Sequence, residues 1–299
     1  MDKEIYMEYI ENEYLKVGIA THGAELSSIF DKKRNKELLW QADPTYWKRH
    51  APVLFPIVGN VNGGAFKYKG KSYPMSAHGF ARDTDFELVK KDGNSVSFSL
   101  RSTAETKEKY PFDFELIITH ILEKNTINVV WDIVNTSDSE PLYYSIGGHP
   151  AFACPINDGE KRSDYKVKFE KDSLTYSLII PDTREVDYQN PSTLTLKDGV
   201  LDITDTLFDK DALIFDDYQV QKASLCTPDG KPYITLTCEG FPSFGLWSHP
   251  SPDAHYVCLE PWLGRCDNKG FDGELPEKYG EQCLEAGKAK TEQYQITIS

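Results

Sequence analysis

Apolar and polar residues alternate along much of the chain with a period of two, which is the pattern of half-buried β-strands. The alternation is strict over residues 95–100, and it recurs over residues 127–133 and 294–299. Each of these segments predicts a strand that turns one face toward a core and the other toward polar surroundings.

Short turn signals separate the alternating segments and predict how they pair. Residues 112–122 and 126–134 flank one such signal and predict a long antiparallel hairpin. Residues 66–68 and 72–74 flank another, which contains a Lys-Gly pair, and predict a shorter hairpin.

Helical periodicity is scarce in this sequence. Residues 43–50 predict one short helix, because Asp43 is a favourable N-cap and Pro44 suits the first helical position. Residues 105–109 predict a single helical turn. No shift in composition divides the chain, so we expect residues 1–299 to form one domain. The predicted fold class is all-β, a large antiparallel β-sandwich with few short helices.

Composition and charge exclude several classes of function. The 299 residues carry a formal net charge of -14, so we expect no nucleic-acid partner, because phosphate binding requires a basic patch. The longest apolar stretch, residues 51–58, is too short to span a membrane and contains two prolines. Residues 1–6 lack the pattern of a signal peptide. We expect a cytoplasmic protein, monomeric or homodimeric.

The six cysteines show neither CxxC pairing nor the regular spacing of a disulfide framework. In a chain of this length they predict reduced, mostly buried thiols and no metal site. Motifs for nucleotide chemistry and serine hydrolysis are also missing from the sequence, since residues 59–64 fit neither a P-loop nor a GxGxxG loop. We therefore expect no cofactor.

His149 lies in an unusual local sequence, after Gly147 and Gly148 and before Pro150. The glycines predict a sharp backbone turn or the close approach of a ligand, and the proline holds His149 near an extended conformation. A histidine held rigidly at a strand end suits general acid catalysis, because its pKa lies near neutral pH. The alternative is a structural histidine packed at a turn.

Glu260 ends an apolar strand and precedes Pro261 and Trp262. A buried carboxylate is costly unless it is paired or functional, and burial beside Trp262 would raise its pKa and make it a stronger base. The alternative is a glutamate in a salt bridge at a strand end. A histidine and a carboxylate facing each other across a pocket can open and close a hemiacetal ring without a cofactor.

Four further residues are candidates for substrate binding. His78 and Arg82 flank Gly79 in a tight segment, and both could donate hydrogen bonds to hydroxyls, unless they only form a surface turn. Arg49 precedes the apolar stretch and could reach a pocket mouth or be solvated. Asp211 precedes a predicted strand, where a carboxylate either accepts hydrogen bonds from paired sugar hydroxyls or forms a turn.

These motifs together resemble the aldose 1-epimerase (galactose mutarotase-like) superfamily. The similarity covers almost the whole chain in the right order, and it is strongest at residues 147–152 and 259–262, with further matches at residues 52–66, 78–82 and 244–248. It is closest to the bacterial branch linked to lactose operons. The segment at residues 78–82 is also similar to hexose-6-phosphate epimerases of the same superfamily.

The resemblance implies a β-sandwich fold, a small sugar as partner and no cofactor or metal. It also implies roles: His149 matches the family's general acid and Glu260 its general base. His78 matches a second histidine that contacts the sugar, and Asp211 matches a hydroxyl-binding aspartate.

One departure from the family concerns an arginine. Galactose mutarotases carry an Asn-Arg string in the stretch that corresponds here to residues 60–64, which contain no arginine. Arg49 and Arg82 are the candidates to substitute for it. The identity of the sugar is therefore left open.

The expected function is an aldose 1-epimerase, an isomerase that interconverts the α and β anomers of a hexose or related sugar. Two alternatives stay open, a non-catalytic carbohydrate-binding protein and a hexose-6-phosphate 1-epimerase. A glycoside hydrolase ranks well behind, and would need two carboxylates, for which Asp211 and Glu260 are the candidates.

Overall fold

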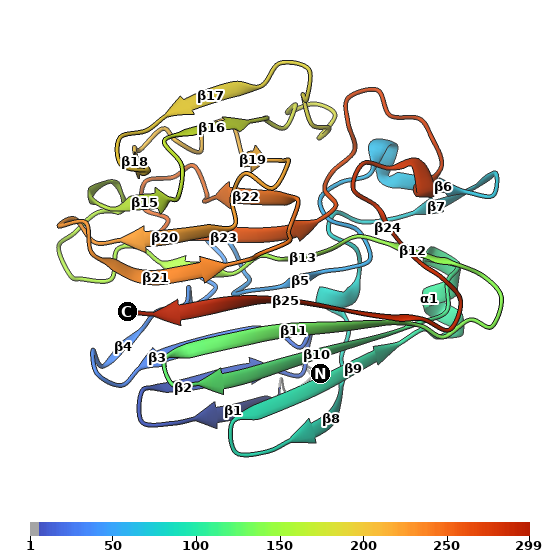
Figure 1. The fold of residues 1–299 in the computed structure, drawn as a ribbon, viewed down its shortest axis with the longest axis horizontal. Helices are drawn as coiled ribbons and strands as arrows, with labels where there is room; N and C mark the ends of the chain where they lie inside the picture. The colour runs from blue at the N-terminus through green and yellow to red at the C-terminus, as the bar shows by residue number, and fades with distance from the viewer. Residues whose placement is uncertain (1–5) are drawn as a thin grey trace.

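The computed structural model describes residues 6–299, which fold mainly into antiparallel strands (Figure 1). Most of the segment inspected for a signal peptide therefore lies outside the described residues. The all-β prediction is confirmed, because the described chain contains one α-helix and only four 3-10 turns: α1 (Ala104–Lys109), η1 (Asn62–Gly64), η2 (Ala81–Asp83), η3 (Arg162–Asp164) and η4 (Leu275–Glu277). Across residues 6–299, no helix has the length and apolarity needed to cross a membrane.

The largest sheet carries the long strands predicted from the alternating pattern. Its order over the described residues is β18 (Val200–Asp202), β15 (Lys166–Phe169), β20 (Lys222–Cys226), β21 (Pro232–Thr237), β25 (Ala289–Ile298), β11 (Thr126–Asn135), β10 (Phe114–Glu123), β9 (Ser95–Arg101) and β8 (Glu87–Lys91). The predicted long hairpin is confirmed as β10 and β11, which pair from Phe114 opposite Asn135 to Glu123 opposite Thr126. The three long strands β10, β11 and β25 lie side by side (Figure 1).

A second sheet carries the two motifs that stand out in the sequence. Its order is β19 (Leu213–Phe215), β22 (Ser243–Trp247), β23 (Tyr256–Leu263), β13 (Ile146–Gly148) and β5 (Val53–Leu54), and β14 (Ala151–Ala153) also pairs with β23. β23 is central, and all of its residues are buried. It therefore presents two buried faces rather than one.

The two faces of β23 have different surroundings, because successive residues of a strand point to opposite sides. Val257 and Leu259 belong to the main hydrophobic core, which they share with strands of the largest sheet. Cys258 and Trp262 belong to two smaller clusters outside that core. We call the side of the sheet that carries Cys258, Glu260 and Trp262 the outer face.

Smaller sheets complete the architecture. A four-stranded sheet contains β1 (Met7–Glu11), β2 (Leu15–Ala20), β3 (Leu26–Asp31) and β4 (Lys36–Glu37), and three strand pairs are β6 (Ala65–Tyr68) with β7 (Lys71–Pro74), β12 (Leu142–Tyr144) with β24 (Gln282–Leu284), and β16 (Ser173–Tyr176) with β17 (Ser192–Thr195). The second predicted hairpin is therefore confirmed as β6 and β7.

The helix predicted over residues 43–50 is wrong. Asp43 begins only one turn, in which its carbonyl accepts hydrogen bonds from the backbone N–H groups of Tyr46 and Trp47. The backbone N–H groups of His50 and Ala51, which a helix would use, donate instead to Glu25 Oε1 at 2.8 and 2.9 Å. A side chain distant in the sequence thus ends the helix before it can extend. The turn predicted at residues 105–109 is confirmed as α1.

Candidate active site

His149 and Glu260 are brought together by strand pairing around β23. β13 places Gly147 opposite Trp262, and β14 places Ala151 opposite Cys258. His149 lies midway between these two pairs and therefore faces Glu260, which lies midway between their partners. The backbone N–H of His149 donates to the carbonyl of Pro52 at 3.2 Å, which fixes the connection between β13 and β14.

The two side chains form a buried proton-transfer pair. His149 Nε2 lies 3.3 Å from Glu260 Oε2, and the side chains are only 8% and 2% exposed. Glu260 Oε2 and His149 Nδ1 are both buried without a hydrogen-bond partner in the described structure. Buried polar atoms are rarely left unpaired, and such exceptions concentrate at functional sites. The unpaired atoms are therefore available to a ligand.

The sharp turn that was predicted for the glycines before His149, as one of two alternatives, is wrong. Gly147 and Gly148 lie within β13, and neither is among the glycines with positive φ, so they form no sharp turn. A Cβ on Gly147 would lie 2.6 Å from the indole of Trp262, and one on Gly245 in β22 would lie 2.5 Å from the same indole. The glycines on both neighbouring strands thus make room for Trp262 on the outer face.

Aromatic rings hold His149 on two sides. Trp47 stacks on the imidazole with ring centroids 4.6 Å apart and an interplanar angle of 27°. Trp247 meets the same imidazole edge-on at 5.5 Å. Trp47 was not predicted from the sequence, because this residue belongs to an irregular segment whose contacts depend on the tertiary fold.

Burial and nearby charges separate the pKa values of the pair. Burial, together with the positive charge of Arg82, lowers the pKa of His149 to about 3. Burial raises the pKa of Glu260 well above its ordinary value, with a further contribution from the negative charge of Asp211. Both shifts favour the uncharged form of the pair, in which His149 is a neutral imidazole and the one shared proton lies on Glu260.

His78 lies beside His149, with the two rings at 78° and their centroids 5.7 Å apart. Its Nδ1 accepts a hydrogen bond from the backbone N–H of Gly59 at 3.1 Å, so the neutral ring carries its proton on Nε2. Burial lowers the pKa of His78 well below its ordinary value, and the charge of Arg82 adds to the effect. His78 is therefore a neutral hydrogen-bond donor, as the sequence led us to expect.

Arg49 and Arg82 lie next to this histidine pair and share one counter-ion. Arg49 Nη2 lies 2.7 Å from Asp83 Oδ1, and Arg82 Nε lies 3.7 Å from Asp83 Oδ2. Burial and the charge of Arg49 lower the pKa of Arg82 to about 10. The negative charge of Glu25 also acts on Arg82, so the two guanidinium groups face two carboxylates on this side of the site.

Asp211 lies on the other side of the site, two residues before β19, as predicted. Its Oδ2 is 2.7 Å from Arg184 Nη1, and its Oδ1 accepts a hydrogen bond from the backbone N–H of Ala212 at 2.8 Å. Arg184 was not predicted from the sequence, because it belongs to a polar turn with no motif of its own. All six residues predicted for the site thus lie around one location, and Arg184 joins them.

Cys258 lies on the outer face two residues before Glu260. Cys258, His149 and Glu260 each offer one possible metal-ligand atom, and these three atoms lie within 4.8 Å of one another. Burial and the charge of Glu260 raise the pKa of the Cys258 thiol well above its ordinary value. The thiol of Cys258 is therefore an uncharged neighbour of the pair.

All six cysteines of the chain are free, and only Cys283 is exposed, which confirms the prediction of reduced, mostly buried thiols.

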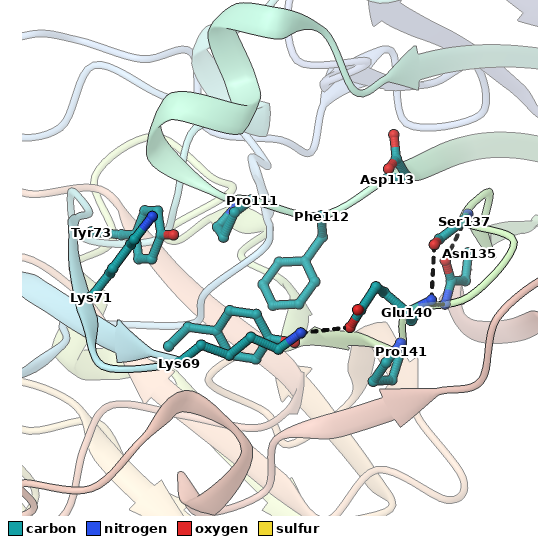
Figure 2. A pocket seen from close by; sticks show the side chains of 11 residues that line it. Lys69, Lys71, Tyr73, Pro111, Phe112, Asp113, Asn135, Ser137, Glu140 and Pro141 are labelled. Atoms are coloured by element: carbon teal, nitrogen blue, oxygen red, sulfur yellow. Dashed lines mark hydrogen bonds and ion pairs between the residues drawn. The ribbon is translucent and has the colours of Figure 1, made fainter.

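The predicted site residues do not line the pocket shown in Figure 2, a separate hollow of about 290 Å³. There Lys69 and Glu140 form an ion pair at 2.7 Å between Phe112 and Pro141. Four charged residues line it, of which Glu140 pairs with Lys69 and Asp113 with Lys107. The pocket contains neither His149 nor Glu260, so it is not a candidate for the chemistry expected from the sequence.

Comparison with known proteins agrees with the fold. The protein LacX of Lactococcus lactis subsp. lactis, in its chromosomal and plasmid forms, is 34% identical over 261 residues, which cover 85% of this chain and 87% of LacX. Among solved structures, a galactose mutarotase related enzyme from Lactobacillus acidophilus has a TM-score of 0.92 and 36% identity, covering 98% of this chain and 97% of that one.

A galactose mutarotase-like protein from Lactobacillus casei has a TM-score of 0.88 and 33% identity, covering 98% of this chain and 100% of that one. The resemblance expected from the motifs and the predicted antiparallel sandwich are thereby confirmed. The family model described as aldose 1-epimerase matches residues 8–291. The chain therefore belongs to the aldose 1-epimerase family.

Proposed function

We propose that this protein is an aldose 1-epimerase that interconverts the α and β anomers of a sugar through His149 and Glu260. The observation that carries the proposal is the buried pair itself, with Nε2 and Oε2 3.3 Å apart and unpaired polar atoms on both residues. The sugar-binding residues His78 and Asp211 lie on opposite sides of it.

The proposed reaction moves only protons. Glu260 removes the proton from the anomeric hydroxyl while His149 protonates the ring oxygen, so the bond between the anomeric carbon and the ring oxygen breaks. The open aldehyde rotates about its first carbon–carbon bond, and the reverse transfers close the ring on the other face. The leaving oxygen stays tethered throughout, so the two reacting groups remain at high effective concentration.

The pair needs one proton in total for this reaction. In the empty site that proton lies on Glu260, whereas the proposed first step needs it on His149. The two arrangements differ by one proton transfer across the 3.3 Å between Nε2 and Oε2. Because both arrangements contain the same number of protons, the pH dependence of the activity reports on the pair as a unit rather than on either residue.

Binding roles follow from the hydrogen-bonding capacity of each side chain. His78 donates its Nε2–H to a sugar oxygen, since its Nδ1 is already occupied by Gly59. Asp211 accepts hydrogen bonds from sugar hydroxyls through lone pairs that Ala212 and Arg184 leave free. Trp47, which stacks on His149, supplies an apolar surface of the kind that sugar rings contact.

The test is polarimetry on freshly dissolved α-anomers of glucose and galactose, with the wild type and Glu260→Gln side by side. We expect the wild type to accelerate mutarotation and the variant to lose the acceleration. Sugar binding by the wild type without any acceleration would instead support the non-catalytic carbohydrate-binding protein. Equal acceleration by both proteins would refute the role of Glu260.

A hexose 6-phosphate is the second candidate substrate, favoured by the guanidinium groups of Arg49 and Arg82. Both guanidinium groups pair with Asp83, and Arg82 Nε is buried without a hydrogen-bond partner in the described structure, so it can donate to a phosphate. Glucose 6-phosphate should then be epimerised with a lower KM than glucose, and Arg82→Met should remove the difference. Equal KM values for the two sugars in the wild type would rule out the phosphate preference.

A further inference from the structure

Arg184 and Asp211 form an ion pair from two strained turns. Arg184 has φ 63° and Asp211 has φ 74°, a left-handed conformation that costs energy for any residue other than glycine. His78 at φ 66° is a third residue of the site in this conformation. Strain of this kind persists only where the surrounding structure enforces it, and it concentrates at functional sites.

The turn that carries Arg184 is held firmly at its base. Its backbone N–H donates to the carbonyl of Ile180, and the N–H of Ile180 donates to the carbonyl of Glu185, both at 2.8 Å. The buried carboxylate of Glu185 accepts a hydrogen bond from the N–H of Gly270 at 2.9 Å. The N–H of Val186 donates to the carbonyl of Asp267, so the turn is anchored to the segment after β23.

The guanidinium group of Arg184 lies over the site rather than away from it. Nη1 is 2.7 Å from Asp211 Oδ2, while the side chain stays 47% exposed. Its positive charge contributes to the lowered pKa of His78, and the negative charge of Asp211 contributes to the raised pKa of Glu260. The ion pair therefore faces both halves of the site, with donor groups left over for a ligand.

We propose that Arg184 is a positioning residue for the sugar, which orients Asp211 toward the substrate hydroxyls and shields Glu260 from the charge of Asp211. The proposal rests on the proposed epimerase function and extends it to a residue outside the family motifs. In this arrangement Ala212 holds one carboxylate oxygen of Asp211 and Arg184 holds the other. Each oxygen then keeps a free lone pair, and the two contacts fix the plane of the carboxylate for incoming hydroxyls.

The charged and titratable groups facing Glu260 come from several elements. His149 faces it from the connection between β13 and β14, Cys258 lies on its own strand, and Asp211 with Arg184 faces it from the β19 side. Arg82 acts on the same site through His149. Among these groups, Asp211 is the one whose negative charge Arg184 neutralises.

The experiment compares Arg184→Met with Asp211→Asn and with the wild type. Removing Arg184 exposes the charge of Asp211, so Glu260 should keep its proton to higher pH, by about one unit. Removing the charge of Asp211 should shift the same titration to lower pH. The Glu260 titration is followed by ¹³C NMR of labelled glutamate carboxyl groups, assigned with Glu260→Gln, and needs no catalysis.

Kinetics with the sugar accepted by the wild type give the second readout. Arg184→Met should raise KM about 10-fold through the loss of a charged hydrogen bond, with a smaller effect on kcat, and Arg184→Lys should recover part of the loss. Arg101→Met is the matched control, because Arg101 pairs with Glu115 at 3.0 Å on β9 of the other sheet. It should change neither KM nor the Glu260 titration.

The outcomes separate this proposal from the proposed function. Opposite shifts of the Glu260 titration support the positioning role even if the wild type accelerates no sugar. The proposal is overturned if both variants shift the Glu260 titration in the same direction, or if neither shifts it. An unchanged KM for Arg184→Met in an active enzyme also overturns it.

Discussion

Nε2 of His149 lies 3.3 Å from Oε2 of Glu260, although the two residues are 111 positions apart in the sequence. His149 lies in the connection between β13 and β14, and Glu260 belongs to β23. The contact follows from β13 and β14, which pair with β23 on either side of His149. Because the backbone of both strands is hydrogen-bonded to β23, the separation of the two groups is set by the sheet itself. Proton transfer between the protein and a sugar can then occur without a loop having to close.

Replacement of Glu260 by glutamine should abolish most activity while the protein stays folded. A positioned general base contributes about 10²–10⁴-fold, and glutamine keeps the shape of the protonated carboxyl group of the empty site. Glu281→Gln is the matched control, because Glu281 is a second carboxyl group whose pKa burial raises to about 7, outside the site. Polarimetry and thermal unfolding of both variants check this. Equal losses of activity would show a general effect on the fold.

The activity should not follow the ordinary titration of a histidine. Burial lowers the pKa of His149 to about 3 and raises that of Glu260 well above its usual value, so the pair keeps its single proton between these limits. As the pH falls from 7 to 5, kcat/KM should therefore not decline, because His149 gains no proton in this range. A free histidine would become largely protonated over the same range. An acid limb near pH 6.5 in the kcat/KM profile would contradict the assignment.

Loss of the Trp47 ring should weaken catalysis more than its replacement by a smaller aromatic ring. Trp47 stacks on His149 at 4.6 Å, and aromatic contacts of this kind contribute about 0.5–1.5 kcal/mol, or roughly 2- to 10-fold in rate. Trp47→Ala should lose this factor in kcat, and Trp47→Phe should keep most of it. Identical kinetics for the two variants would show that the stacking does not orient His149.

Addition of a methyl group at Gly245 should destabilise the protein. The new Cβ would lie 2.5 Å from the indole of Trp262, and overpacking of a buried site costs about 1–3 kcal/mol. Gly93→Ala is the control, since Gly93 has open space around it and no positive φ. Urea unfolding of both variants measures the difference. Equal stability of the two would mean that Trp262 can move aside without cost.

The strands were predictable because their signal is local. Alternation over residues 95–100 and 294–299 needs only neighbouring positions, and both segments form strands as expected. The helix over residues 43–50 failed because Glu25 occupies the backbone N–H groups that would extend it. A competing partner of this kind, distant in the sequence, leaves no trace in the local pattern.

The same difference between local signals and partners distant in the sequence decides which residues of the candidate site could be predicted. His149 and Glu260 stood out because their neighbours are unusual, and the structure places them together. The role of Gly147 was misread, since the residue that needs its missing side chain, Trp262, comes from another strand. Arg184 could not be found at all, because its partner Asp211 is 27 positions away and neither residue belongs to a shared motif.

Both faces of β23 are buried, and this has a consequence for which residues of the protein can change during evolution. Its outer face holds Glu260, while its inner face stabilises the molecule through Val257 and Leu259. Substitutions on the inner face of β23 therefore threaten folding and can displace Glu260 at the same time. Arg184 and Asp211 lie on turns outside this constraint. New sugar preferences can thus arise by exchange of turn residues, while the reaction itself is inherited unchanged.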